Sequence, residues 1–219
     1  PRVEHSSYKN LIMQIYGIDL AKEKFDVSFF NPTVKNCSCT AEHKVIRNTD
    51  KGIQKFLSSL PADAVLVAEH TGIYGDRLLK HCTDSHIDIA YVGGHVIHTY
   101  KSSPDRGKTD EQDCAVLREF GERFADKLTF KKFPQAEIYG LRQLARHRSM
   151  LVEDRKRYVT ADKGEDCRPC RETFVKESMK RIVAMLDEEI AATERQMQHL
   201  ISSRKELEKN YDIITSVKG

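Results

Sequence analysis

The chain has 219 residues, enough for one ordinary domain with an appendage or for two small domains. Charged residues make up 32% of it and hydrophobic residues 39%, a polar balance that predicts a solvated helical part beside a compact core. The net charge of +3 does not by itself indicate nucleic-acid binding, and no run approaches the roughly 18 apolar residues of a membrane span. We therefore expect a cytoplasmic protein with no membrane partner.

The first ten residues are polar and lack the apolar core of a signal peptide, so residues 1–10 are interpreted as a disordered or tag-like start. Without a secretory signal, the six cysteines are expected to be free thiols in a reducing compartment. Cys167 and Cys170 form a single C-x-x-C pair, whereas a structural zinc site needs four ligands. Because no second pair stands nearby, a zinc site is disfavoured.

Three β-prone runs open the folded part. Leu11 to Asp19 is predicted to be a buried strand, and Lys24 to Phe30 alternates between polar and apolar positions. The connection between them, Leu20 to Glu23, has the length of a hairpin loop. Ala41 to Arg47 is a candidate third strand.

Helices and strands then alternate. Asn48 to Asp50 offers helix N-caps before apolar residues at helical spacing, and Pro61 is expected to end that helix. The elements expected after it are a central strand at 64–68, a helix at 74–82, a strand at 87–92, a short helix at 96–101 and a helix at 110–124. This β-β-β-α-β-α-β-α order predicts an α/β fold with a mixed sheet and flanking helices, as in ribonuclease-H-like folds.

The composition changes after Leu128, where strand signals cease. Pro134 suits the first turn of a helix over 136–163, a turn is expected over 164–170, and a second helix over 171–211. The second helix carries a heptad seam at Met179, Val183, Leu186, Ile190, Met197, Leu200, Leu207 and Tyr211, with Thr193 and Arg204 filling two gaps.

A helix of about 40 residues would be about 60 Å long, more than a globule of this size can cover. The seam therefore favours a coiled coil that joins subunits into a dimer or tetramer. The alternative is a helical hairpin formed within one chain.

Four carboxylates stand where ligand sites form. Asp19 and Glu69 each follow a predicted buried strand, at the carboxyl ends where ligands of α/β sheets collect. Asp110 and Asp113, three residues apart, lie on one face of a predicted helix start. Each residue alone is typical of an ordinary cap or turn.

Together, these four carboxylates would raise one another's pKa values unless a divalent cation met them. Oxygen ligands suit Mg²⁺, or Mn²⁺ in its place. Such ions assist phosphoryl displacement, so the four are interpreted as catalytic and metal-binding residues.

Three blocks of the sequence carry a family resemblance. Residues 17–22 (Gly-Ile-Asp-Leu-Ala-Lys), 69–74 (Glu-His-Thr-Gly-Ile-Tyr) and 107–113 (Gly-Lys-Thr-Asp-Glu-Gln-Asp) resemble the signature blocks of the DEDD transposases of the bacterial insertion-sequence family one-ten, relatives of the Piv-type DNA invertases. The resemblance covers roughly residues 12–213. Cys114 stands where the family commonly has alanine, a change of one small residue for another.

The resemblance implies a RuvC-like domain over 11–128 that binds Mg²⁺ through Asp19, Glu69, Asp110 and Asp113, and a coiled-coil domain over 129–213 that assembles subunits. It implies a DNA transposase or site-specific recombinase in the bacterial cytoplasm, guided by a structured non-coding RNA that pairs with donor and target DNA. In the family, a serine of a C-terminal domain attacks DNA. Residues 214–219 look like the start of that domain, so we expect a fragment that cannot complete strand exchange.

Basic residues gather around the first long helix and beside the Asp110 pair. Such groups would neutralise phosphates, although a solvated helix face is the simpler alternative. The candidate nucleic-acid-binding residues are Lys101, Arg106, Lys108, Lys131, Lys132, Arg142, Arg146, Arg148, Arg155, Lys156 and Arg157.

Three other functions match parts of the pattern. Actin-like and sugar-kinase ATPases begin with a strand-end aspartate but need a glycine-rich phosphate loop beside it, which Leu20 to Lys22 does not provide. A stand-alone RuvC-like junction resolvase would use the carboxylates with water as the nucleophile. A non-catalytic RNA-binding and oligomerisation module would not use the carboxylates at all.

Overall fold

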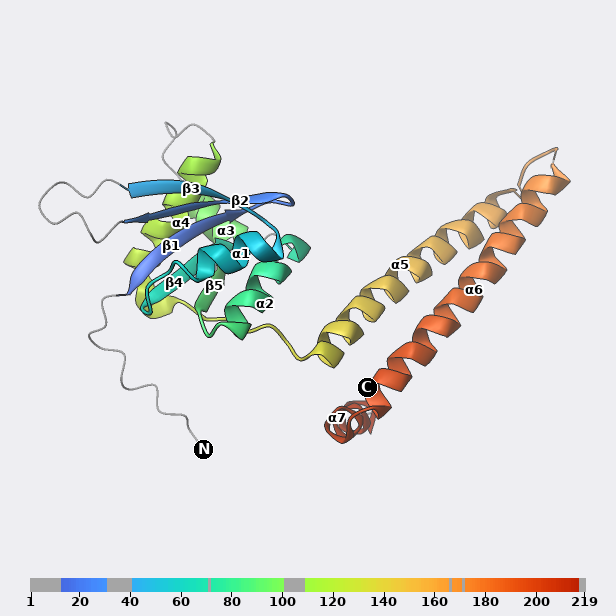
Figure 1. The fold of residues 1–219 in the computed structure, drawn as a ribbon. Coiled ribbons are helices and arrows are strands. Elements are labelled where there is room, and N and C mark those ends of the chain that lie inside the picture. The colour runs from blue at the N-terminus through green and yellow to red at the C-terminus, as the bar shows by residue number, and fades with distance from the viewer. Residues whose placement is uncertain are drawn as a thin grey trace, which may run out of the picture. The chain divides into compact units, whose positions relative to one another are not determined.

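The computed structural model describes residues 13–30, 41–70, 72–100, 109–165, 167–170 and 172–216. The chain divides into two compact units, Pro1–Phe133 and Pro134–Gly219. The first unit is a sheet covered by helices, and the second is built from helices alone (Figure 1). No helix among the described residues is long and apolar enough to cross a membrane.

Five strands form the sheet of the first unit. They are β1 (Gln14–Leu20), β2 (Lys24–Phe30), β3 (Ala41–Arg47), β4 (Ala64–Glu69) and β5 (Asp88–Val92). Their order across the sheet is β3-β2-β1-β4-β5, with β2 antiparallel to both neighbours and β4 parallel to both of its own. The mixed sheet with flanking helices expected from the sequence is therefore confirmed.

Two helices of this unit, α1 and α4, begin at side-chain caps that the sequence supplies. The elements are α1 (Asp50–Leu57), η1 (Gly72–Gly75), α2 (Asp76–Asp84), α3 (Gly94–Tyr100), α4 (Asp110–Arg123) and η2 (Ala125–Lys127). Thr49 caps α1 and Thr109 caps α4, each accepting a hydrogen bond from the backbone N–H three residues further on. The expectation that Pro61 ends α1 is wrong, because the helix already closes at Ser58, whose N–H bonds to the Gln54 carbonyl.

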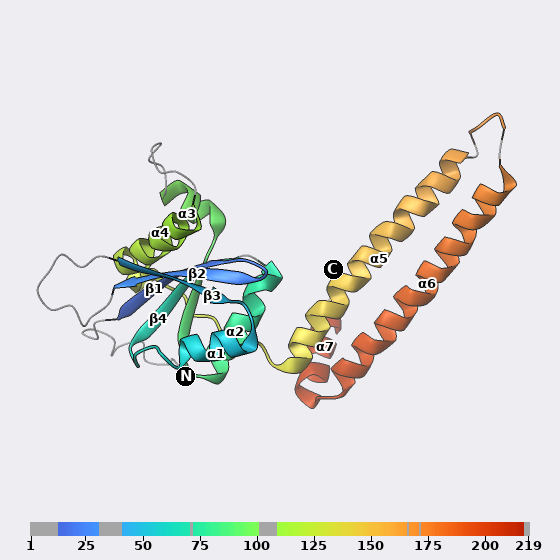
Figure 2. The same cartoon turned by 45° about the horizontal axis from the view of Figure 1, so that its top comes forward.

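Alternate residues of the strands point to opposite faces of the sheet, and an apolar core lies on each face. Figure 2 shows α1 and α2 on one face of the sheet and α3 and α4 on the other. One core contains Ile18, Phe25 and Leu66 and is closed by α1 and α2. The other contains Ile15, Val67 and Val92 and is closed by α3 and α4. A residue's position in the alternation therefore decides which pair of helices its side chain meets.

Helix α4 lies directly on β1, and Gly17 makes this approach possible. A Cβ atom at Gly17 would lie 2.1 Å from the Cys114 carbonyl oxygen and 2.3 Å from the Arg118 nitrogen, both backbone atoms of α4. Arg118 is 4% exposed, donates hydrogen bonds to Ser28 and Glu122, and lies over the Phe30 ring at 3.9 Å. These contacts fix the helix against β1 and β2.

The second unit is a hairpin of α5 (Ala136–Glu165) and α6 (Thr173–Ser202), which lie side by side, followed by α7 (Lys205–Ser216) (Figure 1). The prediction of one helix over 171–211 is wrong, because the chain turns at Ser203 and Arg204. The Arg204 guanidinium lies 2.6 Å from a Glu137 carboxylate oxygen and donates to the Gln135 side chain. A contact with the start of α5 thus accompanies the break.

Side chains of the predicted heptad seam pack inside this hairpin. Leu186 and Thr193 are buried, and the other seam residues from Met179 to Leu200 are half-buried in α6. A Cβ atom at Gly140 of α5 would lie 3.2 Å from Leu200 Cδ1, so small and large side chains meet across the pair. The intrachain alternative therefore accounts for the seam from Met179 to Leu200, whereas Leu207 and Tyr211 lie in α7. Assembly with another chain stays a prediction. Ile213 to Ser216 belong to α7, and 217–219 lie outside the described residues.

Candidate carboxylate site

Asp19 and Glu69 lie at the carboxyl ends of two neighbouring parallel strands. The register of β1 and β4 pairs Ile18 with Ala68, and each carboxylate is the next residue of its strand. Val67 packs in the core beneath α4, so Glu69, two residues later, points to the same face. Asp19 follows Gly17 by two residues and shares that face. The sheet thus turns both strand-end carboxylates toward α4.

The first turn of α4 contributes the other two predicted carboxylates. Asp110 and Asp113 follow the Thr109 cap, and the Asp110 side chain is 59% exposed whereas Asp113 is half-buried. Because Gly17 lets α4 lie against β1, this turn is held close enough to Asp19 for their charges to interact. Three separate elements therefore supply the four residues singled out from the sequence.

The pKa of Asp19 is raised from 3.8 to about 6. Burial is the largest cause, followed by the negative charges of Asp113, Asp110, Glu69 and Asp26. Among the described residues, no three His, Cys, Asp or Glu side chains stand together as a group that could hold a metal ion. The carboxylates are therefore close enough to repel one another but are not gathered as a closed set of ligands.

Asp26 is a fifth carboxylate of this neighbourhood, and sequence reasoning missed it as a site residue. The antiparallel register pairs it with Asp19, and directly opposite residues share a face of the sheet. Asp26 is only 4% exposed, and its two oxygens lie 2.8 Å from His43 Nε2 and 3.2 Å from Lys24 Nζ. The short connection after Leu20 was the available signal, because it fixes which residues of the hairpin face each other.

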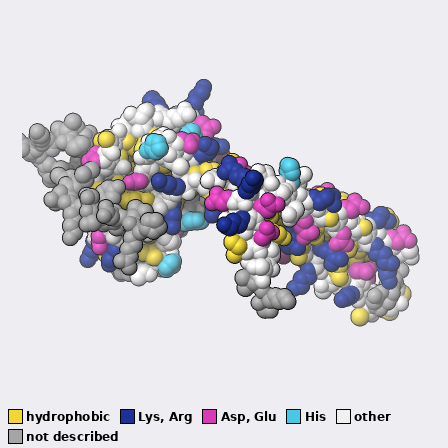
Figure 3. Space-filling view, turned by 90° about the horizontal axis from the view of Figure 1, so that it is seen from below, with side chains coloured by type: hydrophobic (Ala, Val, Ile, Leu, Met, Phe, Trp, Pro, Cys, Tyr) yellow, Lys and Arg dark blue, Asp and Glu magenta, His cyan; other side chains and the backbone are white. Residues whose placement is uncertain are grey.

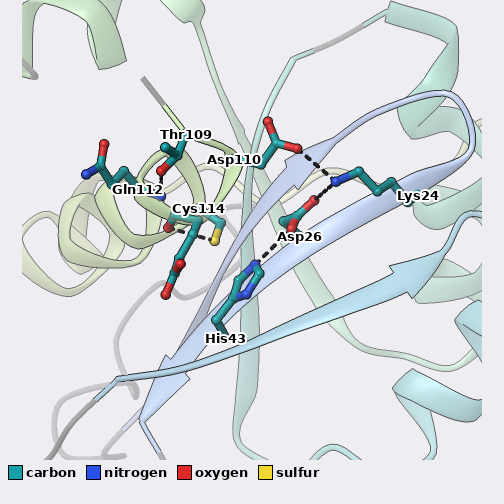
Figure 4. Close-up of polar contacts among 8 residues, drawn as sticks. Lys24, Asp26, His43, Thr109, Asp110, Gln112 and Cys114 are labelled. Carbon is teal, nitrogen blue, oxygen red and sulfur yellow. Dashed lines mark hydrogen bonds and ion pairs between the residues drawn. The ribbon is translucent and has the colours of Figure 1, made fainter. Parts of the chain in front are cut away.

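Lys24 joins Asp26 to the α4 carboxylates. Its Nζ donates to Asp110 Oδ2 at 2.8 Å while remaining within 3.2 Å of Asp26 (Figure 4). The hydrogen bond from Lys24 holds the pKa of Asp110 below its ordinary value, and the same contact raises the pKa of Lys24. A chain of polar contacts thus runs from His43 of β3 through β2 to α4.

Two small residues, Gly94 and Cys114, lie beside the carboxylates. A Cβ atom at Gly94, the first residue of α3, would lie 2.6 Å from Glu69 Oε1, so glycine lets this carboxylate approach the start of that helix. Cys114 is fully buried, donates its S–H to the Glu111 carbonyl at 3.1 Å, and has a pKa raised to about 12, chiefly by burial. Its thiol is therefore protonated and serves as a small packing group. The described cysteines, Cys82, Cys114, Cys167 and Cys170, are all free.

The predicted nucleic-acid-binding residues occupy different environments. Lys101, Arg106 and Lys108 lie outside the described residues, and Lys131 and Lys132 are exposed. On α5, Arg148 and Arg155 form ion pairs with α6, to Glu194 at 2.6 Å and Asp187 at 2.5 Å, and Arg157 lies 3.1 Å from Asp154. Of the predicted residues on α5, those that are exposed and form no ion pair with a described residue are Arg142, Arg146 and Lys156.

The helical unit does not carry a purely basic surface on the face seen in Figure 3. Lysine and arginine side chains there are interspersed with aspartate and glutamate along the hairpin (Figure 3). This agrees with the ion pairs that Arg148 and Arg155 make to α6. Arg148 and Arg155 thus have carboxylate partners within the hairpin, and nucleic-acid binding by the basic residues of α5 stays a prediction.

Comparison with known proteins gives one family and several relatives. The family model of DEDD transposases of IS110 type, described as a transposase, matches residues 16–161. The pilin gene-inverting protein of Moraxella bovis is 25% identical over 207 residues, 93% of this chain and 61% of that protein, and the Moraxella lacunata protein matches to the same extent. The chain thus spans about three fifths of the length of these relatives.

Among solved structures, Thermus thermophilus RuvC matches with a TM-score of 0.38 and 9% identity, over 54% of this chain and 100% of that one. The Thermus thermophilus RuvC structure in complex with a Holliday junction substrate matches with a TM-score of 0.37 and 8% identity, over 54% of this chain and 99% of that one.

Proposed function

Because the chain belongs to the DEDD transposase family of IS110 elements, we propose that it is part of a DNA transposase or site-specific recombinase whose carboxylate site acts on the phosphodiester backbone. One observation carries the proposal. The charges of Glu69, Asp110 and Asp113, from β4 and α4, all act on Asp19 at the end of β1. Carboxylates that repel one another in this way are suited to a divalent cation.

Asp19, Glu69, Asp110 and Asp113 are the proposed ligands of Mg²⁺ or Mn²⁺. Their oxygen atoms are the ligands that these hard cations prefer, and Asp19, with its raised pKa, gains most from a neighbouring positive charge. When bound, the cation would stabilise the negative charge that develops on a phosphodiester during displacement. The protein's own part is to hold the four carboxylates on one side of the sheet, against the first turn of α4.

The finer parts of the proposal rest on the family resemblance. We propose DNA as the substrate, a structured non-coding RNA as the guide, and a serine from a segment beyond these 219 residues as the group that attacks DNA. Exposed basic residues such as Arg142 and Arg146 would contact phosphates. Assembly into a dimer or tetramer would use surfaces of the α5–α6 hairpin.

Calorimetric titration of Mn²⁺ into the chain tests the carboxylate site. Wild-type protein is expected to bind saturably, and the double variant Asp19→Asn with Asp110→Asn is expected to lose binding while keeping its circular dichroism spectrum. Asp126→Asn is the matched control, because this exposed carboxylate lies in η2, outside the proposed ligand set. Unchanged Mn²⁺ binding in the double variant would contradict the proposal and favour a non-catalytic binding module.

A nicking assay separates the composite site from a stand-alone resolvase. Branched DNA is incubated with the chain and Mg²⁺, and the proposal expects no nicking by these 219 residues alone. Nicking that depends on Asp19 would instead favour a nuclease that uses water as the nucleophile.

A further inference from the structure

Resting on the proposed metal site, we propose that Lys24, anchored by the buried Asp26, is a tethered cation that occupies Asp110 until a divalent ion takes that carboxylate. Lys24 would then be a positioning residue that acts on the metal site through Asp110. Lys24 is not among the site residues predicted from the sequence, because its role depends on the register of β1 and β2.

The anchor is a carboxylate that cannot move away easily. Asp26 lies on the sheet face covered by α4, and its side chain is 5% exposed. His43 occupies one of its oxygens at 2.8 Å, and Lys24 lies 3.2 Å from the other. An ordinary surface ion pair joins two flexible side chains, whereas here the ammonium is also tied to a buried partner. The position of Lys24 is therefore set by the sheet and not only by Asp110.

Asp110, the second carboxylate that Lys24 contacts, can change its orientation. The Asp110 side chain is 59% exposed and stands in the first turn of α4, where it can rotate without disturbing the core. Its Oδ2 accepts from Lys24 at 2.8 Å, so that oxygen is engaged by a cation. A divalent ion at the carboxylates would have to take Asp110 from the ammonium and would be repelled by it.

The exchange leaves no charge without a partner. When Asp110 turns to the metal ion, Lys24 keeps its contact with Asp26, so its ammonium is not stranded beside the sheet. Asp110 would therefore always have a cation beside it, first the Lys24 ammonium and then the metal ion. Lys24 would in this way weaken metal binding while keeping Asp110 ordered before the ion arrives.

Calorimetric titration with Mn²⁺ tests this inference on the whole 219-residue chain. Lys24→Met is expected to tighten Mn²⁺ binding by roughly threefold to tenfold. The reason is that a cation 2.8 Å from Oδ2 of the proposed ligand Asp110 is removed. Lys22→Met is the matched control, since this exposed lysine of the same turn has the same charge and no contact with Asp110 in the structure. It is expected to change the affinity by less than about twofold, as is Lys24→Arg, which keeps the charge.

A second measurement follows Lys24 itself. Amine acetylation mapped by mass spectrometry gives the reactivity of Lys24 relative to Lys22 in the same molecule. Addition of Mn²⁺ is expected to raise this ratio severalfold, and Asp110→Asn is expected to raise it without metal. An unchanged ratio in both cases would overturn the tethered-cation role.

The outcomes distinguish the proposed metal site from the proposed role of Lys24. If Mn²⁺ binds and the binding is lost in the Asp19→Asn, Asp110→Asn protein, but Lys24→Met binds as the wild type does or more weakly, the metal site stands and the role of Lys24 is overturned. If the wild-type chain binds no Mn²⁺, both the metal site and the role of Lys24 are overturned. Tighter binding in Lys24→Met together with an unchanged Lys22→Met supports both.

Discussion

Asp26 lies directly opposite Asp19 in the β1–β2 pair, and both carboxylates face α4. Their surroundings differ in one respect that matters for the chemistry. Asp26 has Lys24 and His43 beside it, whereas the pKa of Asp19 is raised to about 6 by burial and by its carboxylate neighbours. Asp26 thus has positively charged or polar partners beside it, whereas Asp19 is a carboxylate whose ionised form is disfavoured.

The raised pKa of Asp19 predicts a pH-dependent stability. A carboxylate with a folded-state pKa above its unfolded value stabilises the fold fully below the unfolded value, here 3.8, and loses that contribution as the pH rises through about 6. Asp19→Asn stays neutral and removes this loss. In chelator-containing buffer we expect the variant to match wild type near pH 4 and to exceed it at pH 7.5 by on the order of 1 kcal/mol, reduced for partial exposure.

Urea unfolding at the two pH values measures this difference, and Asp126→Asn serves as the control with no pH-dependent gain. Added Mg²⁺ is expected to narrow the gap at about pH 7.5, because the ion would stabilise the ionised wild-type site. If Asp19→Asn lowered stability equally at both pH values, repulsion at Asp19 would not be its dominant effect.

The strands and their succession along the chain could be predicted because local patterns specify them. Alternation in Lys24 to Phe30 and the apolar run before Glu69 each match a strand with one or two buried faces. The break between α6 and α7 could not be predicted in this way. The heptad seam continues through Arg204, and the turn there is accompanied by contacts of Arg204 with Glu137 and Gln135, far away in sequence. Periodicity carries no information about such contacts.

The residues of the candidate site differ in the same way, because local sequence patterns reveal some of them but not Asp26. Asp19 and Glu69 stand out because a charged residue directly after an apolar run is visible in the sequence, and Asp110 because it follows a helix cap. Asp26 has no such mark, since a polar residue in an alternating strand usually faces water. Here the polar side of β2 is covered by α4, an arrangement that depends on Gly17 and becomes visible only in three dimensions.

Gly17→Ala is expected to lower the free energy of unfolding by roughly 2–4 kcal/mol. The new Cβ would lie 2.1 and 2.3 Å from backbone atoms of α4, and neither the backbone of β1 nor that of α4 can shift without disturbing its packing. Urea unfolding measures the loss. Gly164→Ala is the matched control, since nothing lies within 4 Å of a Cβ there and the change in α5 is expected to be neutral or to stabilise by up to about 1 kcal/mol. A Gly17→Ala protein as stable as wild type would show that α4 does not depend on this contact.

Gly94→Ala is expected to act on metal binding more than on stability. The atom its Cβ would meet, at 2.6 Å, is Oε1 of Glu69, the movable end of a side chain. Glu69 can turn away at little cost to the fold but would then leave the other carboxylates, so we expect Mn²⁺ affinity to fall severalfold. Gly93→Ala is the neighbouring control, because its Cβ would meet only the His95 ring, at 3.0 Å. Equal losses of affinity in both variants would point to the backbone around the start of α3 instead of to Glu69.

The two kinds of arginine on α5 predict opposite phenotypes. Arg142 and Arg146 are exposed, whereas Arg148 and Arg155 are paired with α6. If α5 contacts phosphates, Arg142→Ala with Arg146→Ala should leave stability unchanged and reduce the slope of log Kd against log salt for duplex DNA by about 0.9 per lost contact. Arg148→Ala with Arg155→Ala removes the same charge but should instead lower hairpin stability by about 1 kcal/mol or less per pair, with little change in slope.

Fluorescence anisotropy with labelled duplex DNA over a range of salt concentrations, together with urea unfolding, distinguishes the two double variants. The comparison is informative because both lose two positive charges, so a general electrostatic effect would lower the slope equally in each. Only a direct phosphate contact separates them. If the slope falls equally, or in neither, Arg142 and Arg146 form a solvated helix face, and the nucleic-acid surface must be sought on the first unit, beside Lys131 and Lys132.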